Sequence, residues 1–233
     1  FNAKHNLASI NSINWGRVLA QVVYYFYSSF KIMREKDIKS VNFSVPTGNF
    51  GDAYAGYVAK KMGLPIDKII IATNSNDILS NFFKNGIYKI SKVVPTISPS
   101  MDIQVASNFE RLLYEILDND AVLVRQYMNE LSNIGSFTVN NDRLVRLKKT
   151  FIGLGVNDQC TTDRIASTYS NNAIVIDPHT AVALEGAYTY ENNLRGPCIV
   201  LSTAHPVKFS SAVTRAININ SELPKKYKNI FSL

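Results

Sequence analysis

One segment constrains the fold more than any other, because two apolar runs flank a single helical pattern in it. Residues 41–45 and 68–73 are rich in valine and isoleucine, which favours β-strands. Residues 52–62 have the pattern of a helix that closes at Gly63 and Pro65. A strand, a helix and a second strand in this order form a βαβ unit with parallel strands. The sequence therefore predicts an α/β protein with an open parallel sheet flanked by helices.

The rest of the chain is predominantly helical by the same criteria. An apolar face at helical spacing covers residues 10–34 and ends near Asp37, and a continuous apolar run at residues 198–202 is expected to be a buried strand. Further helices are expected at residues 77–83, 107–118, 121–131, 142–151, 158–169, 179–190 and 210–217. No repeat or low-complexity linker separates these elements, so we treat residues 1–233 as one region without an internal domain boundary.

The loop between the first expected strand and the next helix has the sequence VPTGNFGD at residues 45–52. Gly48 and Gly51 flank an Asn-Phe pair, which would let successive N–H groups point inward at the positive end of the following helix. The spacing alone leaves two interpretations open: a phosphate cradle, or a loop whose glycines relieve turn strain. The loop lacks the Lys-Ser/Thr pair of a Walker motif and the three glycines of a dinucleotide fingerprint. A small phosphate-bearing cofactor such as pyridoxal phosphate would suit it better.

Composition excludes several classes of protein. Of the 233 residues, 46% are apolar and 18% are charged, and no run of about eighteen apolar residues occurs, which argues against a membrane protein. The net charge of +7 comes from scattered lysines without an interleaved aromatic stripe, so we expect a solvated surface and no nucleic-acid partner. Cys160 and Cys198 lack a metal-ligand spacing and are expected to be reduced core thiols. A cytoplasmic location is the default expectation, and an organellar matrix is the alternative.

Five motifs in a fixed order resemble those of one enzyme family. They are NSINWGR at residues 11–17, the glycine loop at 43–52, SPSMDIQV with NFER at 98–111, DPHTA at 177–181 and STAHPVKF at 202–209. Their content and order closely resemble the threonine synthases, which use pyridoxal phosphate on a tryptophan-synthase-β-like fold of type II. The resemblance is to the longer branch found in fungi and enterobacteria, and it implies the same fold and cofactor here.

The resemblance also implies roles for particular residues. Backbone amides of Gly48, Asn49, Phe50, Gly51 and Asp52 would hold the phosphate of the cofactor. We expect Asp52 to be a helix N-cap that turns its charge away from that phosphate. Thr203, which follows the last expected strand, would donate a hydrogen bond to the pyridine nitrogen; a helix cap before Pro206 is the structural alternative.

A second set of residues would bind the phosphate of the substrate, O-phospho-L-homoserine. These residues are Asn11, Ser12 and Arg17, whose fork of donors suits a phosphate; an ordinary surface arginine is the alternative for Arg17. The implied reaction converts O-phospho-L-homoserine and water to L-threonine and phosphate, as a carbon–oxygen lyase. His179 and His205 each lie beside a proline at a helix start, and we expect structural roles for both.

The catalytic lysine of the family is not found in this sequence. In the family it forms a Schiff base with the cofactor and lies in an F-x-G-P-T-x-x-F-K-D motif before the NSINWGR element. The surroundings of Lys4 do not match that motif. We therefore expect a C-terminal portion of a longer enzyme, incomplete at the N-terminus of the fold and inactive without the upstream region. A phospho-lyase that yields a 2-oxo acid and a catalytically inactive assembly domain are the alternatives, and the oligomeric state stays open.

Overall fold

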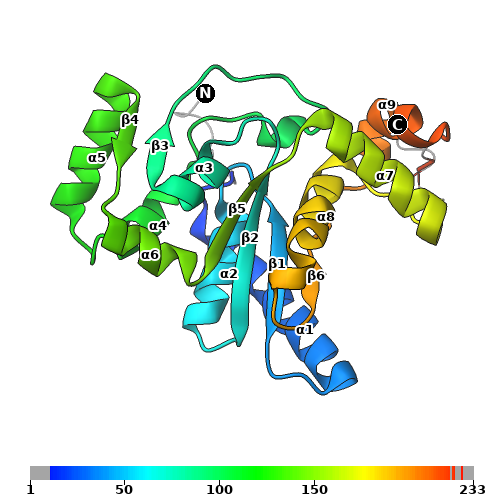
Figure 1. Cartoon of the computed structure of the whole chain (residues 1–233), viewed down its shortest axis with the longest axis horizontal. Coiled ribbons are helices and arrows are strands. Elements are labelled where there is room, and N and C mark those ends of the chain that lie inside the picture. The colour runs from blue at the N-terminus through cyan, green and yellow to red at the C-terminus, as the bar shows by residue number, and fades with distance from the viewer. Residues whose placement is uncertain (1–10, 221, 224–226, 228–233) are drawn as a thin grey trace, which may run out of the picture.

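The computed structural model describes residues 11–220, 222–223 and 227, and its centre is a parallel sheet of four strands (Figure 1). The strand order is β5-β2-β1-β6, with bounds β1 Val41–Pro46, β2 Ile66–Thr73, β5 Phe151–Gly155 and β6 Cys198–Val200. Helix α2, Gly51–Lys61, connects β1 to the parallel β2, so the predicted βαβ unit is confirmed.

Helices cover both faces of this sheet. Their bounds are α1 Trp15–Lys36, α3 Ile78–Asn85, α4 Phe109–Ile116, α5 Ala121–Ile134, α6 Asn141–Lys148, α7 Asp158–Asn172, α8 Pro178–Tyr190 and α9 Ser210–Ile217. Short 3₁₀ helices occupy Pro99–Met101, Glu191–Asn193 and Pro206–Phe209. Helix α8 packs on β1, β2 and β6, and the Ser44 hydroxyl on that face donates a 2.5 Å hydrogen bond to the Ala183 carbonyl. The opposite face carries Phe43, which contacts Tyr25 of α1.

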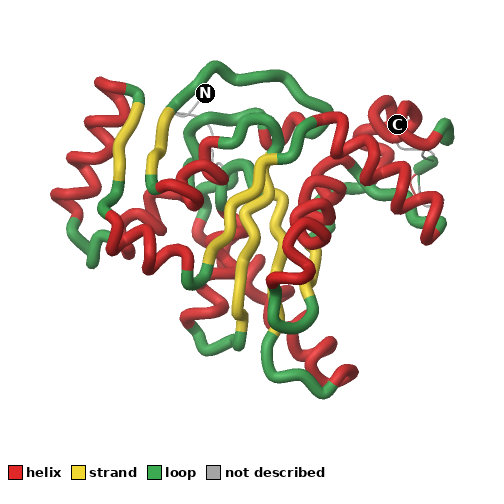
Figure 2. The backbone as a smooth tube through the Cα atoms, in the orientation of Figure 1, coloured by secondary structure: helices red, strands yellow, loops and turns green. Residues whose placement is uncertain are grey.

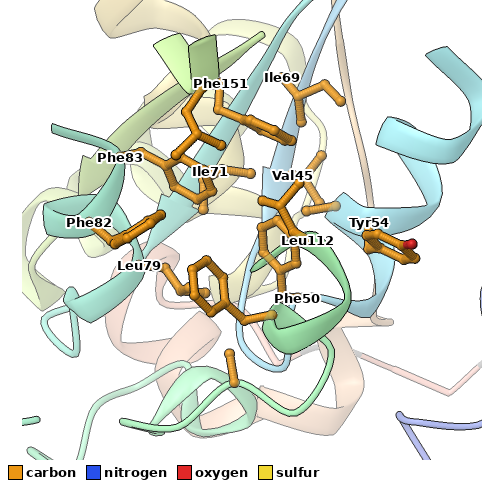
Figure 3. Packing of buried hydrophobic residues seen from close by; sticks show 14 of the residues in the cluster. Val45, Phe50, Tyr54, Ile69, Ile71, Leu79, Phe82, Phe83, Leu112 and Phe151 are labelled. Carbon is orange, nitrogen blue, oxygen red and sulfur yellow. The ribbon is translucent and has the colours of Figure 1, made fainter. Parts of the chain in front are cut away.

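The largest apolar cluster lies between the sheet and helices α1 to α4 (Figure 3). The ring of Phe50, from the glycine loop, stacks on Phe83 with centroids 5.9 Å apart and lies 6.2 Å from Phe151. Each of these rings is at most 2% exposed. Burial of a phenylalanine side chain contributes about 1.5–3 kcal/mol, so the core holds the glycine loop through Phe50.

The structure differs from the expected elements in the middle of the chain. The helix expected at residues 142–151 ends at Lys148, and Phe151–Gly155 forms edge strand β5 instead. A short antiparallel pair, β3 Ile87–Lys89 and β4 Ser136–Thr138, was not expected either, and it lies apart from the main sheet (Figure 2). Both strands have only three residues, too few for a period-two pattern to show.

Two expectations about burial were wrong. The strand expected at residues 198–202 spans only Cys198–Val200 and is half-buried, because in the described residues it pairs with β1 alone, at the sheet edge. Cys160 is exposed on α7 rather than in the core. Both cysteines are free thiols, as expected, and burial raises the pKa of Cys198 to about 12. Among the described residues, no helix is long and apolar enough to cross a membrane.

The other helices agree with the sequence. Helix α9 has the predicted bounds, and α1 ends at Lys36, next to the expected end at Asp37. Helix α3 ends at Asn85, two residues later than expected, with Gly86 as its C-cap. Helix α1 begins at Trp15, after the N-cap Asn14, whose side chain accepts from the Gly16 amide at 2.9 Å. Residues 11–14, which were expected to be helical, form a turn instead, and residue 10 lies outside the described residues.

Candidate functional site

The glycine loop leaves the N-terminus of helix α2 open. Phe50 occupies the N-cap position with φ 64°, and no side chain caps the helix there. The first amides of a helix have no intrahelical acceptor, and together with the helix dipole they attract anions. The buried ring of Phe50 holds this left-handed conformation. The loop thus presents uncapped N–H groups at a fixed position.

The two glycines of the loop are needed for close approach rather than for turn conformation. Neither has a positive φ angle. A Cβ atom on Gly48 would lie 2.7 Å from the backbone oxygen of Ser100, and one on Gly51 would lie 3.1 Å from Nδ2 of Asn108. Any side chain at Gly48 would therefore force the backbone apart. This observation favours the interpretation as a cradle over relief of turn strain.

A cleft of about 180 Å³ opens beside the loop. Its wall includes every loop residue from Pro46 to Ala53, together with Ser12, Arg17, Gln21, Ser100, Met101, His179 and Thr203. The fold therefore brings eight of the nine predicted site residues to one place. Asn11 is the exception: it does not line the cleft, and its side chain accepts from the Ile13 amide at 3.1 Å.

Asp52 lines the cleft but is not the expected helix N-cap. Phe50 takes that position, and the Asp52 carboxylate accepts hydrogen bonds from the hydroxyl groups of Tyr24 and Tyr25 on helix α1. Burial raises the pKa of Asp52 to about 6, although the two phenols favour its ionised form. Burial and the nearby carboxylate raise the pKa values of both tyrosines as well. The carboxylate of Asp52 is thus bound on the side of α1, by a contact that the sequence did not predict.

Asn108, which the motif analysis left without a role, contacts the backbone of two residues that line this cleft. The side chain of Asn108 donates to the backbone oxygens of Ser12, at 2.7 Å, and Asn49, at 3.2 Å. The only sequence indication of this role was the position of Asn108 in the NFER motif, whose function the pattern did not reveal.

Three comparisons with known proteins point to one family. Residues 180–233 match the family model described as "Threonine synthase, C-terminal". The threonine synthase of Saccharomyces cerevisiae is 44% identical over 257 residues, covering 100% of this chain and 50% of that protein. The Pseudomonas aeruginosa enzyme is 42% identical, covering 97% and 48%. The PLP-bound threonine synthase from Brucella melitensis superposes with a TM-score of 0.91 at 43% identity, covering 97% of this chain and 48% of that one.

The chain belongs to the threonine synthase family. Pyridoxal phosphate is the cofactor of this family, and the predicted type II fold is confirmed. The yeast threonine synthase structure also superposes with a TM-score of 0.91 at 40% identity, covering 100% of this chain and 50% of that one. The chain spans about half the length of the curated relatives it matches.

The DPHTA motif supports the wall of the cleft through Ser100. The ring of His179 is buried, and its Nε2 accepts from the Ser100 amide at 3.2 Å, so Nδ1 carries the proton and donates to Asp177 at 2.9 Å. Burial opposes ionisation of Asp177, but hydrogen bonds from His179 and Thr180 outweigh it and lower its pKa. Both ring nitrogens are occupied, which agrees with a structural role. His205 likewise caps the Pro206–Phe209 turn, its Nδ1 accepting from the Val207 amide at 3.2 Å.

Proposed function

We propose that the complete gene product containing this chain is a threonine synthase, which converts O-phospho-L-homoserine and water to L-threonine and phosphate. The observation that carries this proposal is one cleft that combines an uncapped helix N-terminus, the exposed Arg17 and Thr203. The identity of about 40% to curated threonine synthases across the whole chain supports it.

The residues of the glycine loop fit the phosphate group of pyridoxal phosphate. We assign the backbone amides of Gly48, Asn49, Phe50, Gly51 and Asp52 to that phosphate, because neutral N–H donors at a helix N-terminus bind a dianion without an opposing lysine. The close packing at Gly48 supports a cradle formed by backbone alone. When bound, the cofactor supplies an electron-withdrawing ring that stabilises negative charge on substrate carbon atoms.

Thr203 is assigned to the pyridine nitrogen at the other end of the cofactor. It follows β6 at the carboxyl end of the parallel sheet, where open α/β sheets bind ligands, and it lines the cleft. A neutral hydroxyl group donates a hydrogen bond but does not hold a full proton on that nitrogen, as a carboxylate would. Such a contact makes the ring a weaker electron acceptor, which suits elimination and addition at the β and γ carbons better than transamination.

Arg17 and Ser12 are assigned to the phosphate of the substrate. Arg17 extends from the first turn of α1, is exposed at the cleft, and has no ion-pair partner among the described residues. Its guanidinium group offers parallel donors that match two phosphate oxygens. Asn11 is kept in the assignment only as a support of this turn, through its bond to the Ile13 amide.

The residues of this chain bind and orient, whereas a lysine must move the protons at the reacting carbons. We propose that this lysine belongs to the part of the relatives' length that the chain does not span. The substrate, the cofactor and that remaining part of the protein are then the partners of the cleft.

The test is an assay of the complete gene product with O-phospho-L-homoserine, in which threonine and phosphate are both measured. Equal amounts of the two products are expected. Formation of 2-oxobutyrate without threonine would instead identify a phospho-lyase, and no turnover would identify an inactive assembly domain. Arg17→Leu should lower kcat/KM at least tenfold while cofactor absorbance stays unchanged, because a charge-assisted bidentate contact is lost. Arg125→Leu, on the exposed face of α5, is the matched control.

A further inference from the structure

Asn108 connects the two regions that the proposed function assigns to phosphate groups. Its side chain is fully buried and forms no capping bond to its own helix, α4. Instead, Nδ2 donates to the Ser12 backbone oxygen at 2.7 Å and to the Asn49 backbone oxygen at 3.2 Å. The backbone amide of Asn108 donates to the same Asn49 oxygen at 3.1 Å. One amide side chain therefore contacts both the glycine loop and the turn that precedes α1.

Arg111 fixes the orientation of the Asn108 amide. Its Nε donates to Oδ1 of Asn108 at 3.2 Å, and its Nη2 donates to the Ile13 backbone oxygen at 2.8 Å. The guanidinium also lies over the Trp15 ring, 5.5 Å from the centroid. With Oδ1 accepting from Arg111, Nδ2 must face the two carbonyl groups. Both polar atoms of the Asn108 side chain are thus satisfied in one orientation.

These contacts are the polar attachment of residues 11–14 to the rest of the described chain. Their other hydrogen bonds are local: oxygens of Asn11 and Asn14 accept from backbone amides within four residues along the chain. Within the described residues, this turn has one further hydrogen bond to a residue far along the chain, between the hydroxyl groups of Ser12 and Ser107 at 3.4 Å. The distance between this turn and the glycine loop therefore depends on Asn108.

We propose that Asn108, held by Arg111, is a positioning residue that sets the spacing between the substrate-phosphate turn and the cofactor-phosphate loop. This inference rests on the proposed function of those two regions. Its physical basis is the steep dependence of catalysis on geometry: a misplacement of about 1 Å costs roughly a hundredfold in rate. Asn108 touches neither ligand itself, because it acts through the backbone oxygens of Ser12 and Asn49.

A buried asparagine that satisfies carbonyl groups can also be purely structural, and the chain contains a matched example. Asn42, at the start of β1, is fully buried, and its Nδ2 lies within 3.0–3.3 Å of the carbonyl oxygens of Arg195, Gly196 and Pro197. Its Oδ1 accepts from the Lys68 amide at 3.1 Å. Asn42 lies at the opposite end of β1 from the glycine loop. It therefore has the same chemistry without contact to either phosphate region.

The experiment compares Asn108→Ala, Arg111→Gln and Asn42→Ala in the complete gene product. Three quantities are measured: the Kd of pyridoxal phosphate, the Kd of inorganic phosphate with the cofactor saturating, and the melting temperature. Asn108→Ala should weaken both affinities at least fivefold. Arg111→Gln should weaken mainly the affinity for inorganic phosphate, because its second bond goes to Ile13 in the turn, and Arg111→Lys should restore part of it. Asn42→Ala should lower the melting temperature and leave both affinities within twofold.

Asn108→Ala with lowered melting temperature and unchanged affinities would overturn the proposal, since it would behave like the control. If Asn108→Ala does not fold, Arg111→Gln decides, because Arg111 is only half-buried. An unchanged affinity of Arg111→Gln for inorganic phosphate would also overturn the proposal. Both affinities are measured without turnover. Lack of threonine formation by the wild-type protein would therefore refute the proposed function alone and leave this test intact.

Discussion

Replacing Asp52 by asparagine is expected to stabilise the protein at neutral pH. The Asp52 carboxyl lies between helices α1 and α2 at the wall of the cleft, where burial raises its pKa from 3.8 to about 6 despite hydrogen bonds from Tyr24 and Tyr25. Ionisation is thus harder in the folded protein than in the unfolded chain. An asparagine has nearly the same shape, and its side-chain oxygen can accept the same two phenol hydrogen bonds without carrying a charge.

The magnitude and its sign follow from the two pKa values. A tenfold change in an equilibrium constant corresponds to about 1.4 kcal/mol, so the difference between 3.8 and about 6 corresponds to about 3 kcal/mol. The pKa of Asp52 is higher in the folded protein than in the unfolded chain, so the protonated carboxyl favours the folded state relative to the ionised one. This contribution to the free energy of unfolding is fully present below pH 4 and is lost as the pH rises through 6. The amide of asparagine must find partners for its own N–H groups, which reduces the gain. We expect Asp52→Asn to be more stable by about 1–3 kcal/mol at pH 7.5.

The assay is urea unfolding of both proteins at pH values from 4 to 8. The difference in unfolding free energy should be small near pH 4, should grow up to pH 7 and should then become constant. Other titrating groups are common to both proteins and cancel in this difference. Tyr24→Phe serves as a second probe: it removes one donor that favours the carboxylate, so the titration should move to higher pH. A difference that does not change with pH, or an asparagine variant less stable at pH 8, would refute the reasoning.

Three further outcomes are expected. Gly48→Ala should weaken pyridoxal phosphate binding at least tenfold in an absorbance titration, because its Cβ would lie 2.7 Å from the Ser100 oxygen; unchanged affinity would show that the loop adapts. Thr203→Asp should place a proton on the pyridine nitrogen and lower threonine formation relative to side reactions, and an unchanged product ratio would argue against the contact. Phe83→Ala should destabilise the protein by about 3–5 kcal/mol in urea unfolding, since the ring is 2% exposed beneath Phe50; a loss below 1 kcal/mol would contradict this packing.

The parts of the fold that the sequence predicted are those with strong local signals. The βαβ unit was predictable because Gly63 and Pro65 end the helix that separates the two apolar runs. Helix α3 was predictable because a glycine, Gly86, follows it, and in the structure this glycine is the C-cap with φ 78°. Strand β5 was not predictable, because its sequence FIGLG contains two glycines, which disfavour strands. Tertiary contact explains one of them: a Cβ on Gly153 would lie 2.3 Å from the Ser80 backbone oxygen of α3. Position 153 therefore requires glycine because helix α3 packs so closely against β5, and not because of local strand propensity.

In the candidate site, too, the features with local sequence signals were predicted and those that depend on tertiary contacts were not. The glycine loop, Arg17 and Thr203 were found because their motifs are continuous in the sequence, and the fold brings them to one cleft. The expectation for Asp52 failed because N-cap preference is a local rule, whereas the buried ring of Phe50 fixes where the helix starts. Asn108 lies in the NFER motif, but nothing in its local sequence indicated which residues it contacts. Its contacts join residues 96 and 59 positions away in the chain, and only the folded structure brings these together.

The charge of Asp52 would oppose a phosphate bound at the proposed cradle, and two features reduce this repulsion. The phenols of Tyr24 and Tyr25 bind the Asp52 carboxylate on the side of α1, so its charge does not compete for the loop amides. A pKa near 6 also means that a proton can neutralise the group when a phosphate dianion raises that pKa further. Binding of phosphate between pH 6 and 7 should then take up a proton, and this uptake should vanish in Asp52→Asn. Isothermal titration calorimetry in buffers of different ionisation enthalpy measures it directly. An equal uptake in the two proteins would show that another group responds to the phosphate.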